Sequence, residues 1–142
     1  MRLQQSAEIA ATPEILFDLT QDYGRRLDWD PYLKEARLID AKRPGVGVHA
    51  WCVATNGFGM ETRYVSFRPP SACAVEMVRG PWLLKAFSGS WRFEPVGPCR
   101  TRVEFIYSLA GRPAFLTRVL AKIFDHDTRR RLAALRRAAE VL

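Results

Sequence analysis

Two adjacent stretches of the sequence decide the fold: TRVEFIYSL at residues 101–109 and RPAFLTRVLAKIFDHDTRRRLAALRRAAEVL at residues 112–142. The first alternates between apolar and polar side chains, the period-two pattern of a half-buried strand. The second repeats its apolar residues at the helical period of 3.6. We therefore predict a strand followed by one long C-terminal helix, with about 28 helical residues spanning about 42 Å. The apolar face of this helix is expected to contain Leu116, Leu120, Ile123, Phe124, Leu135, Ala138 and Leu142. The opposite, polar face is expected to contain Arg118, Lys122, Asp125, Arg129 and Arg136.

The middle of the chain reads as short strands separated by turns. Gly and Pro pairs punctuate it at fairly even intervals, which is typical of an antiparallel meander. Asn56-Gly57 predicts a type I′ turn, with positive φ at both residues, between strands at 46–55 and 58–67. The run 82–94 is long for one strand, so we expect a bulge or strong bend at Gly89.

The N-terminal third predicts a strand and two short helices. Residues 2–10 alternate, and Thr12-Pro13-Glu14 then opens a helix, because Thr caps and Pro fits the first helical position. Its apolar stripe is expected to be Ile15, Leu16 and Leu19. A second short helix is expected at 21–28, ending before Pro31.

These elements make a single α+β domain over residues 1–142. The length suits one domain, and 48% hydrophobic with 26% charged residues is ordinary globular composition. No apolar run is long enough for a membrane span, and the first residues do not resemble a signal peptide, so we expect a cytoplasmic protein. One helix cannot cover a curved seven-stranded sheet completely. A binding cavity is therefore expected between the concave face of the sheet and the C-terminal helix.

Charge is concentrated at the C-terminal end. The net charge is +7, and residues 112–142 contribute eight Lys and Arg against three Asp and Glu, or +5. Such a segment could contact RNA or another anionic surface, or could be a solvated helix face. Three consecutive arginines at 129–131 point in three directions on a helix and lack interleaved aromatics, which argues against nucleic acid as the partner.

The three cysteines have no metal-site or disulfide spacing. Cys52, Cys73 and Cys99 are interpreted as reduced packing residues. With two histidines, His49 and His126, a three-histidine metal site is excluded, and we predict neither a metal nor a cofactor. His49 is expected to be a sheet histidine with a satisfied ring, and His126 to lie at the surface.

Three segments resemble the START-like (SRPBCC) superfamily of polyketide cyclases, dehydrases and lipid-transport proteins. These are residues 9–19, the Trp29-Asp30-Pro31-Tyr32 turn, and residues 89–95 together with 101–105. The resemblance covers nearly the whole chain and implies a helix-grip fold: a curved seven-stranded antiparallel sheet wrapped around a long C-terminal helix. It also implies an apolar pocket, while family members include carriers, cyclases and ribosome-associated proteins. Fold does not choose among these activities.

Asp127 and Arg131 are the polar pair expected in that cavity. They stand four residues apart on the apolar helix face, where an acid and a base can pair. A partly buried charged pair would anchor a carbonyl, hydroxyl or carboxylate of an apolar ligand; a salt bridge at the cavity mouth is the structural alternative. For catalysis the candidates are Asp127, Arg131 and Tyr64, since no catalytic motif is present.

Aromatic and methionine side chains complete the predicted ligand site. Met60, Thr62 and Tyr64 share one face of a strand, so a one-residue register error would turn all three outward. Plain core packing is the alternative for each aromatic residue. The ligand-binding set comprises Trp29, Trp51, Met60, Tyr64, Met77, Trp82, Phe87, Phe105, Tyr107, Leu120, Phe124, Asp127 and Arg131.

Binding or carriage of a small hydrophobic molecule (a lipid, polyketide or aromatic compound) is the function that the sequence favours. An aromatase/cyclase-like enzyme acting on a polyketide is the alternative, because such chemistry needs little beyond a shaped pocket and one acid or base. Association with the ribosome or RNA through the basic helix is the third hypothesis. The expected state is a monomer or a homodimer.

Overall fold

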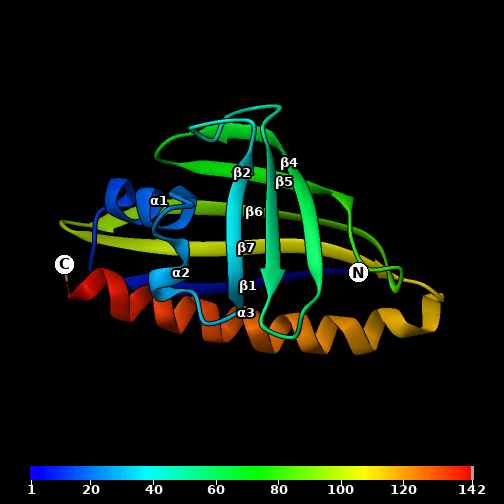
Figure 1. Cartoon of the computed structure of the whole chain (residues 1–142). Coiled ribbons are helices and arrows are strands. Elements are labelled where there is room, and N and C mark those ends of the chain that lie inside the picture. Colours follow the sequence, from blue (N-terminus) through cyan, green and yellow to red (C-terminus); the bar gives the residue numbers. More distant parts are fainter. Residues whose placement is uncertain (142) are drawn as a thin grey trace.

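A computed structural model describes residues 1–141 and has the α+β helix-grip architecture expected from the sequence (Figure 1). Leu142, expected on the apolar face of the last helix, lies outside the described residues. The elements are β1 (Arg2–Ile9), α1 (Pro13–Gln21), α2 (Arg26–Trp29), β2 (Leu33–Ile39), β3 (His49–Ala54), β4 (Gly59–Arg68), β5 (Ala72–Arg79), β6 (Leu84–Gly97), β7 (Arg100–Gly111), the 3₁₀ turn η1 (Ala114–Leu116) and α3 (Thr117–Glu140).

One antiparallel sheet of seven strands, ordered β1-β7-β6-β5-β4-β3-β2, forms the body of the molecule. The sheet bends strongly, so that β2, β3 and β4 cross in front of β6 and β7 in Figure 1. Helix α3 runs along the lower edge beside β1, and α1 and α2 close one end. This geometry leaves the concave side of the sheet facing α3.

Strand β1 and helix α1 form as the sequence predicts, with one exchange in the helix, whereas the second helix, expected at 21–28, is the shorter α2 at Arg26–Trp29. Thr12 Oγ1 accepts a hydrogen bond from the Ile15 backbone N–H, and Pro13 takes the first helical position. Ile15 is exposed, however, and Phe17 is buried in its place. The Phe17 ring packs edge-on against Phe67 and Phe93, a tertiary contact that the helical period alone does not specify.

The β3–β4 hairpin differs from the predicted type I′ turn. Only Gly57 has positive φ (96°), while the Ala54 carbonyl accepts from the Gly57 N–H and the Ala54 N–H donates to the Phe58 carbonyl. This is a three-residue loop in which glycine alone needs the left-handed conformation. Asn56 contributes through its side chain instead, since its Oδ1 accepts from the Phe58 N–H at 3.0 Å.

No bulge interrupts the sheet at Gly89, so the first of the two predicted alternatives, a bulge or a strong bend, is wrong. Gly89 pairs in regular register with Val75 on β5 and Tyr107 on β7, and the irregularities of β6 lie near its two ends. Glycine is required here by close packing, because an added Cβ would stand 2.9 Å from Cζ of Phe105. The Phe105 ring therefore lies directly over the strand.

The core lies between the sheet, α1 and the C-terminal half of α3. The inward residues of β7, Val103, Phe105, Tyr107 and Leu109, are all buried as predicted. Helix α3 starts at Thr117, after the 3₁₀ turn, and is shorter than expected. Leu135 is fully buried, whereas Ile123, expected on the buried face, is 49% exposed.

Asp125 corrects the expected polar face of α3. Its Oδ1 accepts from Gln5 Nε2 on β1 at 2.6 Å and lies 3.4 Å from the Tyr107 hydroxyl, so the side chain faces the sheet. Cys99 is also corrected: it is exposed in the β6–β7 turn with φ of 52°, while Cys73 is buried. His49 is paired as predicted, with Nδ1 2.6 Å from Glu61 Oε2.

Candidate functional site

A cavity of about 200 Å³ lies between the concave face of the sheet and α3. Most of its lining is apolar, and the lining residues that are exposed mark its mouth: Asn56 and Phe58 from the β3–β4 loop, Leu83 before β6, and Ile123 of α3. The volume is below the roughly 300–1,000 Å³ of drug-sized ligand pockets, which suits a compact molecule.

The walls change in character along α3. Near the start of the helix they are apolar, with Leu84 and Phe87 of β6 opposite Leu120 and Phe124, and the Phe87 and Phe124 rings stack at 5.3 Å. About two turns further along the helix, polar side chains line the cavity: Gln21, Tyr23, Arg26, Tyr32, Tyr64, Asp127, Thr128 and Arg131. The cavity therefore has an apolar end near the mouth and a polar, closed end.

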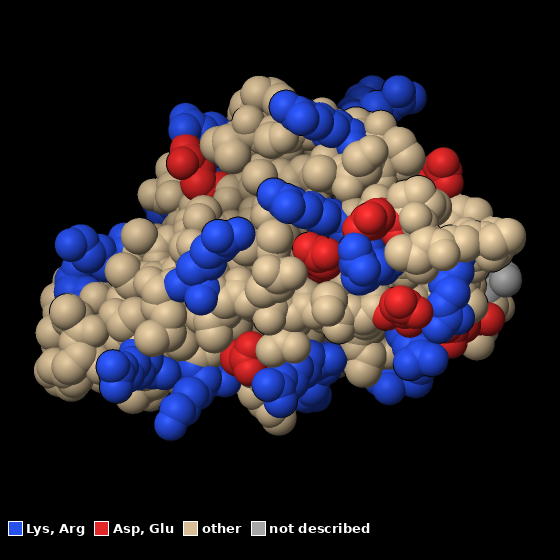
Figure 2. All heavy atoms as spheres, turned by 180° about the vertical axis from the view of Figure 1, so that it is seen from behind, with Lys and Arg blue, Asp and Glu red and all other residues tan. Residues whose placement is uncertain are grey.

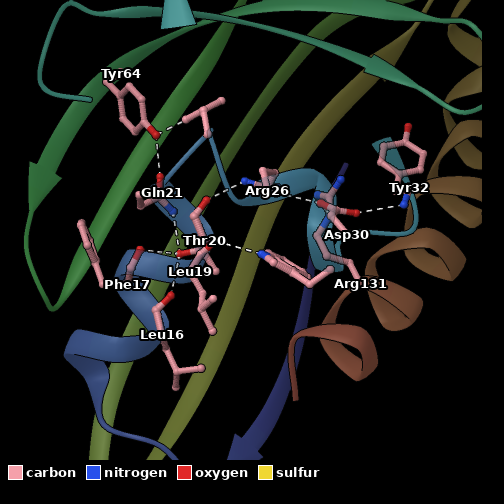
Figure 3. Close-up of polar contacts among 12 residues, drawn as sticks. Leu16, Phe17, Leu19, Thr20, Gln21, Arg26, Asp30, Tyr32, Tyr64 and Arg131 are labelled. Carbon is pink, nitrogen blue, oxygen red and sulfur yellow. Dashed lines mark hydrogen bonds and ion pairs between the residues drawn. The ribbon is translucent and has the colours of Figure 1, made fainter. Parts of the chain in front are cut away.

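Two guanidinium groups share one buried carboxylate at the closed end (Figure 3). Nε of Arg26 and Nε of Arg131 lie 2.8 and 2.9 Å from Oδ2 of Asp30, whose side chain is fully buried. The other Asp30 oxygen accepts from the Tyr32 backbone N–H at 2.9 Å. Burial acts to raise the pKa of Asp30, but the two arginines outweigh it and lower that pKa.

The two arginines are held differently. Arg26 also donates from Nη1 to the Thr20 carbonyl at 2.7 Å, which ties it to the end of α1. The Arg131 guanidinium stacks over Tyr32 at 4.9 Å, and its buried Nε has no aligned hydrogen bond despite the ion pair with Asp30. Among the described residues no acceptor receives a hydrogen bond from its terminal nitrogens. Arg131 thus presents unfilled donors in a cavity-lining position.

A hydroxyl and amide chain forms the rest of this end. The Tyr64 hydroxyl donates to Gln21 Oε1 at 2.5 Å and lies 3.3 Å from the Tyr23 hydroxyl, and Gln21 Nε2 donates to Thr20 Oγ1. Burial raises the pKa of Tyr23 to about 12, and it also raises the pKa of Tyr64. Both phenols are therefore neutral hydrogen-bonding groups at physiological pH.

Asp127 lines the cavity without a close basic partner. No Lys, Arg or His nitrogen within the described residues reaches its carboxylate at ion-pair distance, and burial raises its pKa. The predicted Asp127–Arg131 pair is wrong, because Arg131 turns toward Asp30 instead. The consecutive arginines do diverge as expected: Arg129 pairs with Asp125 across one helical turn, while Arg131 points inward.

Five of the predicted ligand-binding residues do not line the cavity. Trp29 is buried and donates to the Leu19 carbonyl, and Tyr107 is buried against Asp125. The Trp51 ring covers Gly59, and the Met77 sulfur covers Gly80. Trp82 is 66% exposed, with Arg112 over its ring. The predicted residues that do line the cavity are Met60, Tyr64, Phe87, Phe105, Leu120, Phe124, Asp127 and Arg131.

The sequence-based reasoning missed the contribution of α1 and α2. Gln21, Arg26 and Asp30 were not singled out, although Arg26 and Asp30 stand four residues apart, the spacing of a helical ion pair. Each comes from a short element far in sequence from Arg131, so only the tertiary fold brings them together. Within residues 1–141, no three His, Cys, Asp or Glu side chains are grouped to hold a metal ion.

Comparison with known proteins agrees with this geometry. A family model described as polyketide cyclase/dehydrase and lipid transport matches residues 1–140. No curated protein matches the sequence. In the part of the chain that the structure describes, none of the helices has the length and apolar character needed to cross a membrane.

Solved structures share the fold at low sequence identity. The Zhui aromatase/cyclase from a Streptomyces species superposes with a TM-score of 0.83 at 16% identity, covering 99% of this chain and 93% of that one. A START superfamily protein from Mycobacterium smegmatis gives 0.82 at 14% identity, covering 98% and 97%. Norcoclaurine synthase from Thalictrum flavum, in complex with dopamine and hydroxybenzaldehyde, gives 0.73 at 14% identity, covering 97% and 85%.

Proposed function

Because this chain belongs to the polyketide cyclase/dehydrase and lipid transport family, we propose that it binds a compact hydrophobic molecule in the cavity between its sheet and α3. One observation carries the proposal: an apolar cavity ends at the Arg131 guanidinium, whose terminal nitrogens donate to no described residue. A ligand acceptor placed there would gain a hydrogen bond to a charged group inside a mostly apolar cavity, where such bonds are strong.

The ligand would enter with its apolar body between β6 and α3. Phe87, Leu120 and Phe124 offer flat apolar surface near the mouth, and burial of apolar area supplies most of the binding free energy. A carbonyl or carboxylate oxygen at the inner end would accept from Arg131, and the neutral Tyr23 and Tyr64 hydroxyls line the same cavity. A lipid, polyketide or aromatic compound of this shape fits the proposal.

The test is a thermal-shift series with pairs of compact ligands that differ only in the acceptor, such as naphthalene and naphthoic acid. We expect the acid to raise the melting temperature more than the hydrocarbon. Arg131→Met should weaken binding of the acid by about ten- to a hundredfold, the contribution of a hydrogen bond to a charged group, and leave the hydrocarbon unaffected. Arg130→Met, on the exposed neighbour, is the matched control. If no compact apolar compound stabilises the protein, the proposal fails.

A second candidate, cyclisation of a reactive ligand, is favoured by Asp127. This carboxyl lines the cavity, has no close basic partner and has a raised pKa, so it is the group best suited to exchange a proton with a bound molecule. Asp127→Asn would then abolish turnover of a polyketide mimic while leaving its dissociation constant nearly unchanged. Equal losses of binding and turnover would assign Asp127 to anchoring alone.

The proposal includes a reducing, cytoplasmic setting. Cys52, Cys73 and Cys99 are all free, and proteins that mature in oxidising compartments usually pair their cysteines. Labelling the three thiols in freshly lysed cells tests this point, since one disulfide-linked pair would contradict it.

A further inference from the structure

The rim of the cavity carries an unusual concentration of exposed apolar side chains. Trp82 is 66% exposed, Phe115 78% and Phe58 55%, and each comes from a different connection: β5–β6, β7–α3 and β3–β4. Such large side chains are normally buried, and a cluster of them on a surface marks an interaction site. In Figure 1 the β3–β4 hairpin and the β5–β6 connection both reach the side of α3.

Contacts join these connections into one surface. The Arg112 backbone N–H donates to the Leu83 carbonyl, and the Arg112 guanidinium lies 5.6 Å from the Trp82 ring centroid. Phe58 and Leu83 both line the cavity and are exposed, so both lie at its opening. Phe115 of η1 precedes Val119 and Ile123 of α3 by four-residue steps, and all three are exposed, with Ile123 at the opening. We call this set of side chains, with Trp82, the mouth surface.

Two of the three segments that carry the mouth surface lack acidic residues, and in the third, the β3–β4 hairpin, Glu61 is ion-paired with Arg79. Residues 77–93 and 105–124 contain Arg and Lys but no Asp or Glu. Lys85, Arg112, Arg118 and Lys122 are exposed, and none forms an ion pair with a described residue. On the face turned away in Figure 1, Figure 2 shows acidic side chains among the basic ones. Elsewhere in the chain basic side chains are paired, as Arg100 and Arg102 are with glutamates.

We propose that the mouth surface docks on an anionic lipid bilayer, with the opening of the cavity turned toward the membrane. Exposed Trp and Phe insert favourably at the headgroup level, and Lys and Arg beside them attract anionic lipids. Single aromatic side chains that protrude from three connections suit a deformable lipid surface. A protein partner would instead need pockets that match each of them.

Sedimentation with vesicles tests the proposal on the purified chain, with no cavity ligand required. The protein should bind vesicles of equal parts phosphatidylglycerol and phosphatidylcholine, bind pure phosphatidylcholine at least tenfold more weakly, and be released by high salt. Tryptophan fluorescence should shift to shorter wavelength on binding, and Trp82→Ser should remove the shift, since Trp29 and Trp91 are buried and Trp51 is half-buried. Trp82→Ser with Phe115→Ser should weaken binding at least tenfold.

Charge-reversal variants distinguish docking through the mouth surface from a general attraction of the basic protein to anionic vesicles. Arg118→Glu with Lys122→Glu should weaken binding at least tenfold, whereas Arg136→Glu with Arg137→Glu, the same change at the far end of α3, should have a much smaller effect. Equal losses in both variants, or full binding by the Trp82→Ser/Phe115→Ser variant, would overturn the proposal. Failure to bind anionic vesicles would also overturn the proposal. If polyglutamate then captured the protein, the partner would be an acidic protein. The vesicle experiments do not bear on the cavity proposal, which the ligand series with Arg131→Met tests separately.

Discussion

Asp30 shows how one residue sets the properties of the closed end of the cavity. Its fully buried carboxylate neutralises only one of the two arginines that contact it, so the cluster keeps one excess positive charge. A buried ion pair contributes little net stability, but removing one partner leaves buried charge without compensation. The excess charge is the property that would attract a ligand acceptor, and it depends on Asp30 being present.

Replacing Asp30 with Asn should therefore be strongly destabilising. We expect a loss of about 3–5 kcal/mol, the usual effect of breaking a buried ion pair from one side. Urea denaturation followed by circular dichroism measures it. Asp28→Asn, on an exposed residue of α2 two positions before Asp30, is the control and should change stability by less than about 0.5 kcal/mol. Similar effects from both variants would show that the buried cluster is not a source of stability.

The lowered pKa of Asp30 gives stability a defined dependence on pH. The unfolded value is about 3.9, and the folded value is below it. The folded state therefore holds the proton less tightly, so the contribution is fully present above pH 4 or so and is lost as pH falls through the folded pKa. Stability measured from pH 6 downward should fall in this acid range, and Asp30→Asn should lack that part of the decline. An unchanged acid profile in the variant would contradict the assignment.

At the scale of elements, packing rather than backbone conformation explains Gly89. Gly89→Ala should cost about 1–3 kcal/mol, because its Cβ would press on the Phe105 ring, which is itself confined by neighbouring aromatics. Gly45→Ala is the control, since an added Cβ there meets nothing within 4 Å. Thermal unfolding measures the stability of both variants. If Gly89→Ala is as stable as wild type, the Phe105 ring moves aside without cost.

Helix α1 begins at the Thr12 cap and ends with Thr20 and Gln21, of which Gln21 lines the cavity. Stability of the helix therefore helps to position these side chains. Thr12 accepts the Ile15 N–H at 3.3 Å, and its loss leaves a helix donor unfilled. We expect Thr12→Ala to reduce stability by about 1 kcal/mol. Thr12→Ser retains the hydroxyl and should remain near wild type, so equal losses from both changes would exclude the cap as the cause.

At the scale of the whole molecule, the cavity links ligand binding to folding. A molecule bound only by the folded state stabilises it by about 2.7 kcal/mol at a concentration of 100 times its dissociation constant. The melting temperature should therefore rise with the logarithm of ligand concentration for any true cavity ligand. Phe124→Ala removes an apolar wall of the cavity and should reduce the rise in melting temperature at a fixed ligand concentration. A rise identical to that of wild type would place the ligand elsewhere.

The sequence by itself determined the order of elements and the faces of the regular strands. Alternation placed Val103 and Phe105 inward on β7, and helical period placed Leu120, Phe124 and Arg131 toward the cavity, because these patterns follow from backbone geometry alone. Residue types at adjacent positions also predicted the Thr12 cap and the turn at residues 54–58. The type of that turn depended on how the two strands meet.

Only the tertiary structure decided which polar groups meet and which aromatic residues reach the cavity. Local spacing paired Asp127 with Arg131, but the fold offers Arg131 a fully buried carboxylate 101 positions earlier in the chain, and low local polarity makes that contact stronger. Trp29 and Trp82 were both predicted to bind the ligand. Trp29 is buried beside α1, whereas Trp82 is exposed at the mouth surface. Residue type and period define a face, whereas the neighbour on that face depends on how distant segments of the sheet and helices pack.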